Sequence, residues 1–162
     1  METKKTRSVF FILFLLMSFG LGTSCSDDED DFSLDGPGFS VSDLAGTWTA
    51  TSAIFSLNAE GPGQSIDIVE EGGSVTLVIQ NNGRFTITIS ALGETPEIST
   101  GRLAFDEELL VVFFDDDPDD FDFFVIDFSG NNLSLQNNTS EFDFDGDGTD
   151  ESASISLTLV RN

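Results

Sequence analysis

Leu44-Ala45-Gly46-Thr47-Trp48 opens the first predicted strand of a chain in which apolar residues alternate with polar ones. A short helical turn at 42–45 precedes this strand, and Ser42 is its expected cap. The alternation recurs at 75–79, 85–89 and 155–159, whereas helical periodicity is almost absent. Each of these runs has one apolar and one polar face, which is typical of a strand that covers a core.

Short turns rich in glycine, asparagine and aspartate divide the chain, and Asn82-Gly83 between two alternating runs predicts a tight hairpin. The predicted strands are 46–57, 65–70, 74–80, 84–91, 97–106, 109–115, 121–129, 132–136 and 152–161, with 139–144 as a further extension. Two apolar stretches, 109–114 and 123–126, are apolar on both faces, so we expect them to be central or covered outside. Consecutive strands with short connections predict an all-β domain, either an antiparallel up-and-down barrel or a β-sandwich.

The opening segment favours the barrel. Gly46-Thr47-Trp48 resembles the Gly-x-Trp signature of lipocalins, in which the tryptophan plugs the closed end and an arginine of the last strand stacks over it. Here Arg161 ends the last predicted strand. The resemblance covers residues 40–162 and implies an eight-stranded lipocalin-like barrel closed by Trp48 and Arg161, with the sandwich as the alternative.

The first 25 residues predict export from the cytoplasm. A basic start at 4–7, an apolar run at 9–21 and small residues at 22–24 lead to Cys25. The run of 13 residues is shorter than the about 20 that a membrane-spanning helix needs, and it fits a signal-peptide core. The segment resembles a bacterial lipoprotein signal, which implies cleavage before Cys25 and acylation of that residue. The alternatives are a conventional cleavage site upstream of Cys25 or a free thiol.

Ser26-Asp27-Asp28-Glu29 follows the cysteine directly. The residues alone predict a solvated tether, because like charges in a run repel. The stretch also resembles the export signal of Bacteroidetes-type surface lipoproteins, which implies display on the outer face of the outer membrane; a periplasm-facing anchor is the alternative. We therefore divide the chain into a signal peptide (1–24), an acidic flexible tether (25–39) and a barrel domain (40–162) that is expected to be a monomer.

Charge and composition exclude several functions. Without residues 1–24, the chain has 29 acidic and 3 basic side chains and a net charge of −26. This balance argues against a nucleic-acid partner, which needs a basic footprint. The chain contains no histidine and no tyrosine, so imidazole cannot serve as a base or a metal ligand. No nucleophile motif is present either, and we expect no enzymatic activity.

Asp143, Asp145 and Asp147 take the first, third and fifth positions of an EF-hand-type calcium loop, with glycine at the sixth. Thr149 and Glu151 would supply ligands at the seventh and ninth. The twelfth position is serine where such loops carry a bidentate glutamate, so the predicted Ca²⁺ site is weak. The alternative is a polar turn between the last two strands.

An eight-stranded barrel can hold one small ligand among its inward-facing side chains. The expected lining is apolar and comprises Phe55, Leu77, Phe85, Ile87, Phe105, Phe113, Phe123 and Leu135. The same side chains could equally fill a core without a cavity. The sequence therefore predicts a non-catalytic surface module that binds a small apolar ligand. The alternative is a structural or adhesive surface protein with a packed core and acidic, calcium-binding loops.

Overall fold

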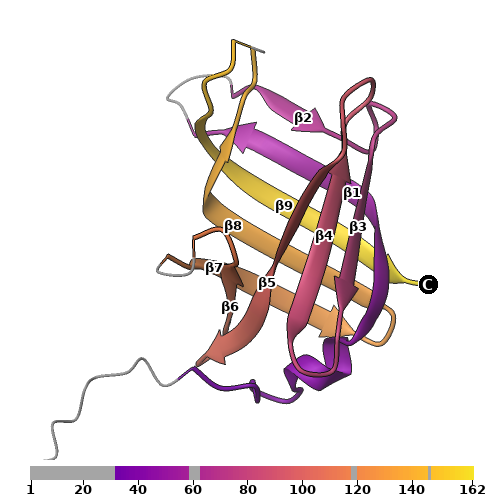
Figure 1. Ribbon diagram of the computed structural model, residues 1–162, viewed down its shortest axis with the longest axis vertical. Coiled ribbons are helices and arrows are strands. Elements are labelled where there is room, and N and C mark those ends of the chain that lie inside the picture. The colour runs from indigo at the N-terminus through magenta and orange to yellow at the C-terminus, as the bar shows by residue number, and fades with distance from the viewer. Residues whose placement is uncertain (1–31, 59–62, 118–119, 146) are drawn as a thin grey trace, which may run out of the picture.

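Nine strands and one short 3₁₀ helix make up the computed structural model, which describes residues 32–58, 63–117, 120–145 and 147–162 (Figure 1). In chain order they are η1 (Val41–Leu44), β1 (Gly46–Leu57), β2 (Ser65–Asp67), β3 (Ser74–Ile79), β4 (Arg84–Ser90), β5 (Glu97–Asp106), β6 (Leu109–Phe114), β7 (Asp122–Ser129), β8 (Asn132–Phe142) and β9 (Glu151–Arg161). The described residues contain no helix with the length and hydropathy needed to cross a bilayer.

A single antiparallel sheet closes on itself through β1. One edge of β1 pairs first with β3 and then with β2, while its other edge pairs with β9 from Trp48 to Leu57. Between these ends, β3 to β9 follow one another as neighbours. A register shift between Ala50 and Ser52 bends the long β1 strand, as a bulge does in a closing sheet. The predicted up-and-down eight-stranded barrel is confirmed, with β2 as an extra strand, and the sandwich alternative is wrong.

The helical turn η1 lies at the closed end of the barrel (Figure 1). Its cap is Ser40 rather than Ser42, because Asp43 reaches back to Ser40. The Asp43 carboxylate accepts hydrogen bonds from the Ser40 backbone N–H at 2.8 Å and from the Ser40 hydroxyl at 3.0 Å. These bonds lower the pKa of Asp43. The sequence-based assignment of Ser42 as the cap was therefore wrong by two residues.

The outer face of β5 and β6 carries a second apolar cluster of Ala104, Val111 and Phe113. Phe32 and Phe121 cover this cluster, and the Phe32 and Phe113 ring centroids lie 5.1 Å apart. This confirms the expected outer cover for the stretch 109–114. The same expectation was wrong for 123–126, where Phe123 is 39% and Val125 60% exposed on the outer face.

The described part of the expected tether, residues 32–39, lies against the barrel rather than extending freely. Ser33 exchanges backbone hydrogen bonds with Phe105, and the Phe39 ring packs against Phe105 and Phe128. Burial of apolar rings such as those at 32 and 39 is favourable, which accounts for these contacts with the barrel.

Asp67 joins β1, β2 and the turn after β2. Its carboxylate accepts hydrogen bonds from the Ser52 hydroxyl at 2.7 Å and from the Ala53 N–H at 3.0 Å. The N–H groups of Val69 and Glu70 also donate to it, at 2.9 and 3.4 Å. Burial raises the pKa of Asp67, but these hydrogen bonds together outweigh burial and hold the pKa below its ordinary value.

Asp67→Asn is expected to lower the free energy of unfolding by about 2 kcal/mol at neutral pH, because charge-assisted bonds are lost. The pKa of Asp67 is lower in the folded than in the unfolded state. Its ionised form therefore stabilises the fold above pH about 4, and this stabilisation is lost as the pH falls through the folded pKa. Urea unfolding of both proteins between about pH 2 and pH 7 measures this. A difference in unfolding free energy between the two proteins that stays constant across that pH range would contradict the prediction.

Candidate ligand site at the open end of the barrel

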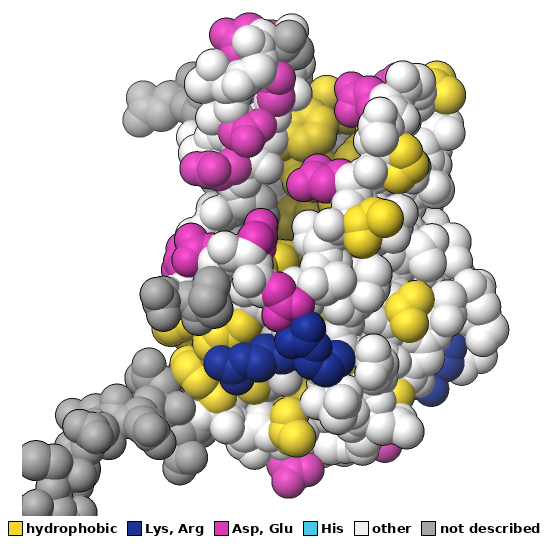
Figure 2. Space-filling view, in the orientation of Figure 1, with side chains coloured by type: hydrophobic (Ala, Val, Ile, Leu, Met, Phe, Trp, Pro, Cys, Tyr) yellow, Lys and Arg dark blue, Asp and Glu magenta, His cyan; other side chains and the backbone are white. Residues whose placement is uncertain are grey.

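The barrel interior is packed at one end and accessible at the other. At the closed end, Leu44, Trp48 and Leu159 have no exposed surface. Towards the open end, the inward-facing side chains of Ile87, Phe114, Phe124 and others are apolar but only partly buried. Figure 2 shows this difference as a hollow with an apolar floor in the upper half of the molecule.

An apolar cavity of about 60 Å³ lies within the barrel. Four residues expected to line the interior do so, and these are Leu77, Phe85, Ile87 and Leu135. Phe55 and Phe105 belong to the packed core, where the Phe55 ring stacks on Phe142 at a centroid distance of 4.5 Å. The enclosed space is small, so any ligand body that enters it has few carbon atoms.

Two expected lining residues lie on the outside instead. Phe113 belongs to the outer cluster on β6, and Phe123 on β7 is 39% exposed. Their neighbours Phe114 and Phe124 line the cavity in their place. Both strands carry apolar residues at consecutive positions, so alternation could not show which side chains face the interior. A shift of one residue moves every side chain of a strand to the opposite face of the sheet.

A second cavity of about 300 Å³, here called the vestibule, adjoins the first at Phe114. Besides Phe114, its lining residues are Ser99, Asp116, Asp117, Asp120, Phe121 and Asp122. The vestibule opens where β5 extends beyond its last pair with β6, which joins Gly101 to Phe114. The barrel wall is therefore interrupted beside the connection between β6 and β7.

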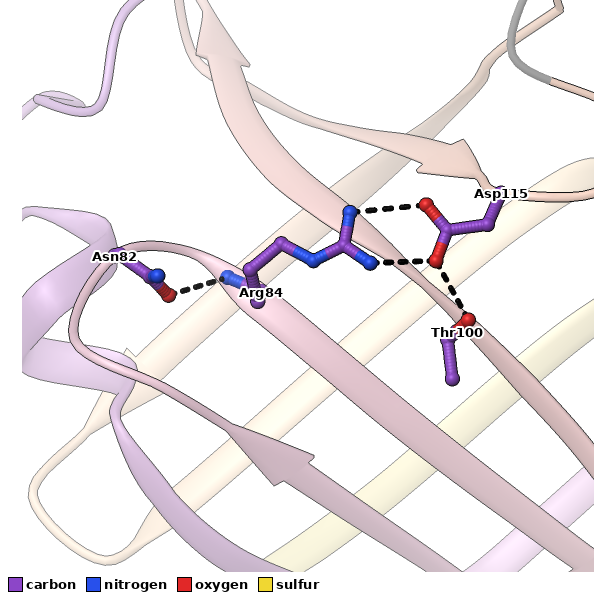
Figure 3. Close-up of polar contacts among 4 residues, drawn as sticks. All are labelled: Asn82, Arg84, Thr100 and Asp115. Carbon is purple, nitrogen blue, oxygen red and sulfur yellow. Dashed lines mark hydrogen bonds and ion pairs between the residues drawn. The ribbon is translucent and has the colours of Figure 1, made fainter.

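An ion pair anchors the start of that connection (Figure 3). The Arg84 guanidinium donates to both carboxylate oxygens of Asp115, at 2.9 and 2.5 Å, and the Thr100 hydroxyl donates to the same carboxylate at 2.6 Å. The hydrogen bonds from Arg84, and to a smaller extent the one from Thr100, lower the pKa of Asp115. The Asn82 side chain accepts from the Arg84 N–H and holds the turn before β4. The negative charge of Asp115 is therefore balanced by the Arg84 guanidinium.

Asp122 lies at the start of β7, next to a buried amide. Asn137 of β8 is 4% exposed, and its side-chain N–H donates to Asp122 at 3.4 Å. The Thr139 hydroxyl donates to the same carboxylate oxygen at 3.3 Å. Sequence reasoning missed Asn137, although it continues the inward alternation of Leu133 and Leu135. The two donors fix Asp122 at the wall of the vestibule.

Trp48 and Arg161 meet at the opposite, closed end. The Arg161 guanidinium carbon lies 4.5 Å from the Trp48 ring centroid, and its Nη2 donates to the Asp43 carbonyl at 2.6 Å. The Trp48 indole N–H donates to the Leu44 carbonyl at 2.8 Å. The buried ring therefore has a partner for its polar atom and a cation over its face.

No family model matches this chain, and no curated protein is similar to it. Some solved structures match part of this chain. One is a lipocalin-like protein from Bacteroides uniformis, at 15% identity and a TM-score of 0.42, and the match covers 74% of this chain and 99% of that one. Another is a protein from Bacteroides eggerthii, at 9% identity and a TM-score of 0.42, with 73% and 98% covered.

The predicted calcium ligands are brought together only in part. Asp143, Asp145 and Asp147 offer carboxylate oxygens that all lie within 4.8 Å of one another. The Glu151 carboxylate instead accepts from the Phe144 N–H at 3.0 Å, and the Thr149 N–H donates to Asp147 at 2.8 Å. The loop can therefore offer three acidic ligands to a cation.

This loop also positions an aromatic side chain at the open end. Phe144 is buried and its ring contacts Phe142 at a centroid distance of 4.9 Å, while Gln64 donates to its carbonyl. A cation held by the loop would therefore restrain the side chain that packs over this end of the core.

The proposed lipidation site and export signal, Cys25 and Ser26 to Glu29, lie outside the described residues.

Proposed function

We propose that this protein is a non-catalytic binding module that takes up a small apolar molecule at the open end of its barrel. The observation that carries this proposal is the contrast between the two ends of the interior. Ile87, Phe114 and Phe124 point inward and yet keep solvent-accessible apolar surface. Covering such surface is favourable by about 25 cal/mol per Å².

A titration with 1-hexanol, followed by amide shifts in ¹H–¹⁵N NMR spectra, tests the proposal. We expect saturable shifts in the open halves of β4, β6 and β7. Ile87→Phe fills the site and is expected to weaken binding about tenfold, since two or so methylene contacts of about 0.8 kcal/mol each are lost. Val78→Phe, on the outer face of the adjacent β3 strand and 39% exposed, is the matched control. Shifts confined to the outer surface, or none, would overturn the proposal.

We further propose that a lipid on Cys25 holds the module at the outer membrane and that Ser26-Asp27-Asp28-Glu29 directs it to the cell surface. Mass spectrometry of the protein from a Gram-negative host should show residues 25–162 with added acyl groups. Cys25→Ser should abolish the acylation. Neutralising positions 27–29 should keep the acyl groups but protect the protein from protease added to intact cells. An unmodified Cys25 thiol would contradict the proposed lipid anchor.

The rival function, a structural or adhesive protein with calcium-binding loops, has its own support in the small enclosed cavity and the three clustered carboxylates. With a dissociation constant of about 1 mM, about 10 mM CaCl₂ should raise the melting temperature by about 5 °C. Asp145→Asn should abolish the rise, and Asp106→Asn, at the exposed end of β5, should not. An equal rise with MgCl₂ or in Asp145→Asn would indicate charge screening and exclude the site.

A further inference from the structure

We propose that the ligand of the open-end site is an amine: a small apolar body that carries a positively charged head. This inference rests on the proposed function and adds the chemical class of the ligand. It follows from how the structure distributes charge around the apolar floor and from the contact between the two cavities.

Acidic side chains concentrate at the open end. The β6–β7 connection supplies Asp116, Asp117 and Asp120 to the vestibule, and the first residue of β7 supplies Asp122. The β8–β9 connection supplies a further acidic cluster. Figure 2 shows acidic side chains around the hollow, with a basic cluster below it. A concave site lined by one sign of charge raises the local concentration of ions of the opposite sign.

The arginines of the described barrel are all engaged elsewhere. Arg84 is bound to Asp115, Arg102 lies 3.6 Å over the outward-facing Phe113 ring, and Arg161 lies over Trp48. Among the described residues, the only ion pair joins Arg84 to Asp115, and Asp115 does not line the vestibule. The negative charge of the vestibule therefore has no cation from the barrel to balance it.

The two cavities lie next to each other at Phe114, because this residue lines both the apolar interior and the vestibule. A molecule whose apolar end contacts Phe114 can place its other end among Asp116, Asp117 and Asp122. Phe114 and Phe121 also offer aromatic surface, which attracts ammonium groups. A carboxylate or phosphate head at the same place would meet like charges and lose its hydration.

Three six-carbon probes with different heads test the inference: hexylammonium, 1-hexanol and hexanoate, titrated at neutral pH in EDTA and followed by amide shifts. We expect hexylammonium to bind at least about tenfold more tightly than hexanoate, with 1-hexanol between them. Raising NaCl to about 300 mM should shrink this preference several-fold, because salt screens exposed charges. All three probes should shift the same amides of β4, β6 and β7.

Two variants that each remove two acidic groups distinguish an effect of the vestibule from an effect of the total net charge. Asp116→Asn/Asp117→Asn removes two exposed vestibule acids and should reduce the hexylammonium preference at least threefold. Glu107→Gln/Glu108→Gln removes two exposed acids from the β5–β6 turn and should leave the preference unchanged. An equal loss in both variants would overturn the inference, because it would show only attraction to an acidic protein.

The outcomes also separate this inference from the proposed function. Equal affinity for all three probes would leave the apolar site standing and overturn the charge preference. Absence of binding by 1-hexanol, with hexylammonium shifts limited to acidic loops and absent from Ile87 and Phe124, would overturn both.

Discussion

Trp48→Ala is expected to lower the free energy of unfolding by about 4 kcal/mol, which approaches the total stability of many domains. The indole ring has no exposed surface, and its N–H is bonded to the Leu44 carbonyl. Removal of the ring would leave a cavity beneath Arg161 and next to Phe128. Because Trp48 is the sole tryptophan, urea unfolding should be followed by far-UV circular dichroism rather than by fluorescence.

Two further variants divide this effect into its parts. Trp48→Phe keeps an aromatic ring at the closed end and is expected to cost about half as much. Arg161→Met keeps an apolar stem over the ring but removes the cation and its bond to the Asp43 carbonyl, so a loss of about 1–2 kcal/mol is expected. A Trp48→Ala protein within 1 kcal/mol of the original would show that this end of the barrel is not closed by the ring.

Gly101→Ala is the second substitution with a large expected effect, about 3 kcal/mol or failure to fold. Gly101 of β5 is paired with both neighbouring strands, with Phe85 of β4 on one side and Phe114 of β6 on the other. A methyl group there would overlap the Phe113 carbonyl oxygen and lie 2.6 Å from the Phe85 ring. The oxygen belongs to the backbone of the paired strand, so it cannot move away without disturbing the pairing of β5 with β6.

Gly63→Ala provides the control, because among the described residues a methyl group at that position would meet only the Leu57 carbonyl oxygen, at 3.7 Å. Its unfolding free energy should stay within about 0.5 kcal/mol of the original. Equal stability of the Gly101 and Gly63 variants, measured by urea unfolding, would contradict the close approach of β5 to Phe85.

Strand positions were largely predictable from the sequence because alternation and turn residues act locally. The segments 46–57 and 97–106 were placed with the bounds that the structure shows. The local turn chemistry at Asn82-Gly83 also ends β3 and begins β4 as expected. The extension of β8 to Phe142 was harder to place, because the register shift between Asn137 and Ser140 interrupts the alternation.

The prediction of which side chains point inward failed where both faces of a strand are apolar. Phe113 and Phe123 were assigned to the interior, and the structure places Phe114 and Phe124 there instead. The choice depends on Phe32 and Phe121, which cover Phe113 from outside. Both covering rings lie outside β6, and Phe32 is far from it in the chain, so the pattern within one strand contains no information about these contacts.

The sequence by itself determined the all-β class, the sequence of strands, the excess of acidic groups and the acidic loop at 143–147. The tertiary structure decided which acids share a space with the apolar interior, since the vestibule joins residues of β5 and the β6–β7 connection at Phe114. It also decided that Arg84 binds Asp115 rather than a vestibule acid. The physical reason is that barrel closure and strand stagger fix these distances, and both arise from pairing across the whole sheet.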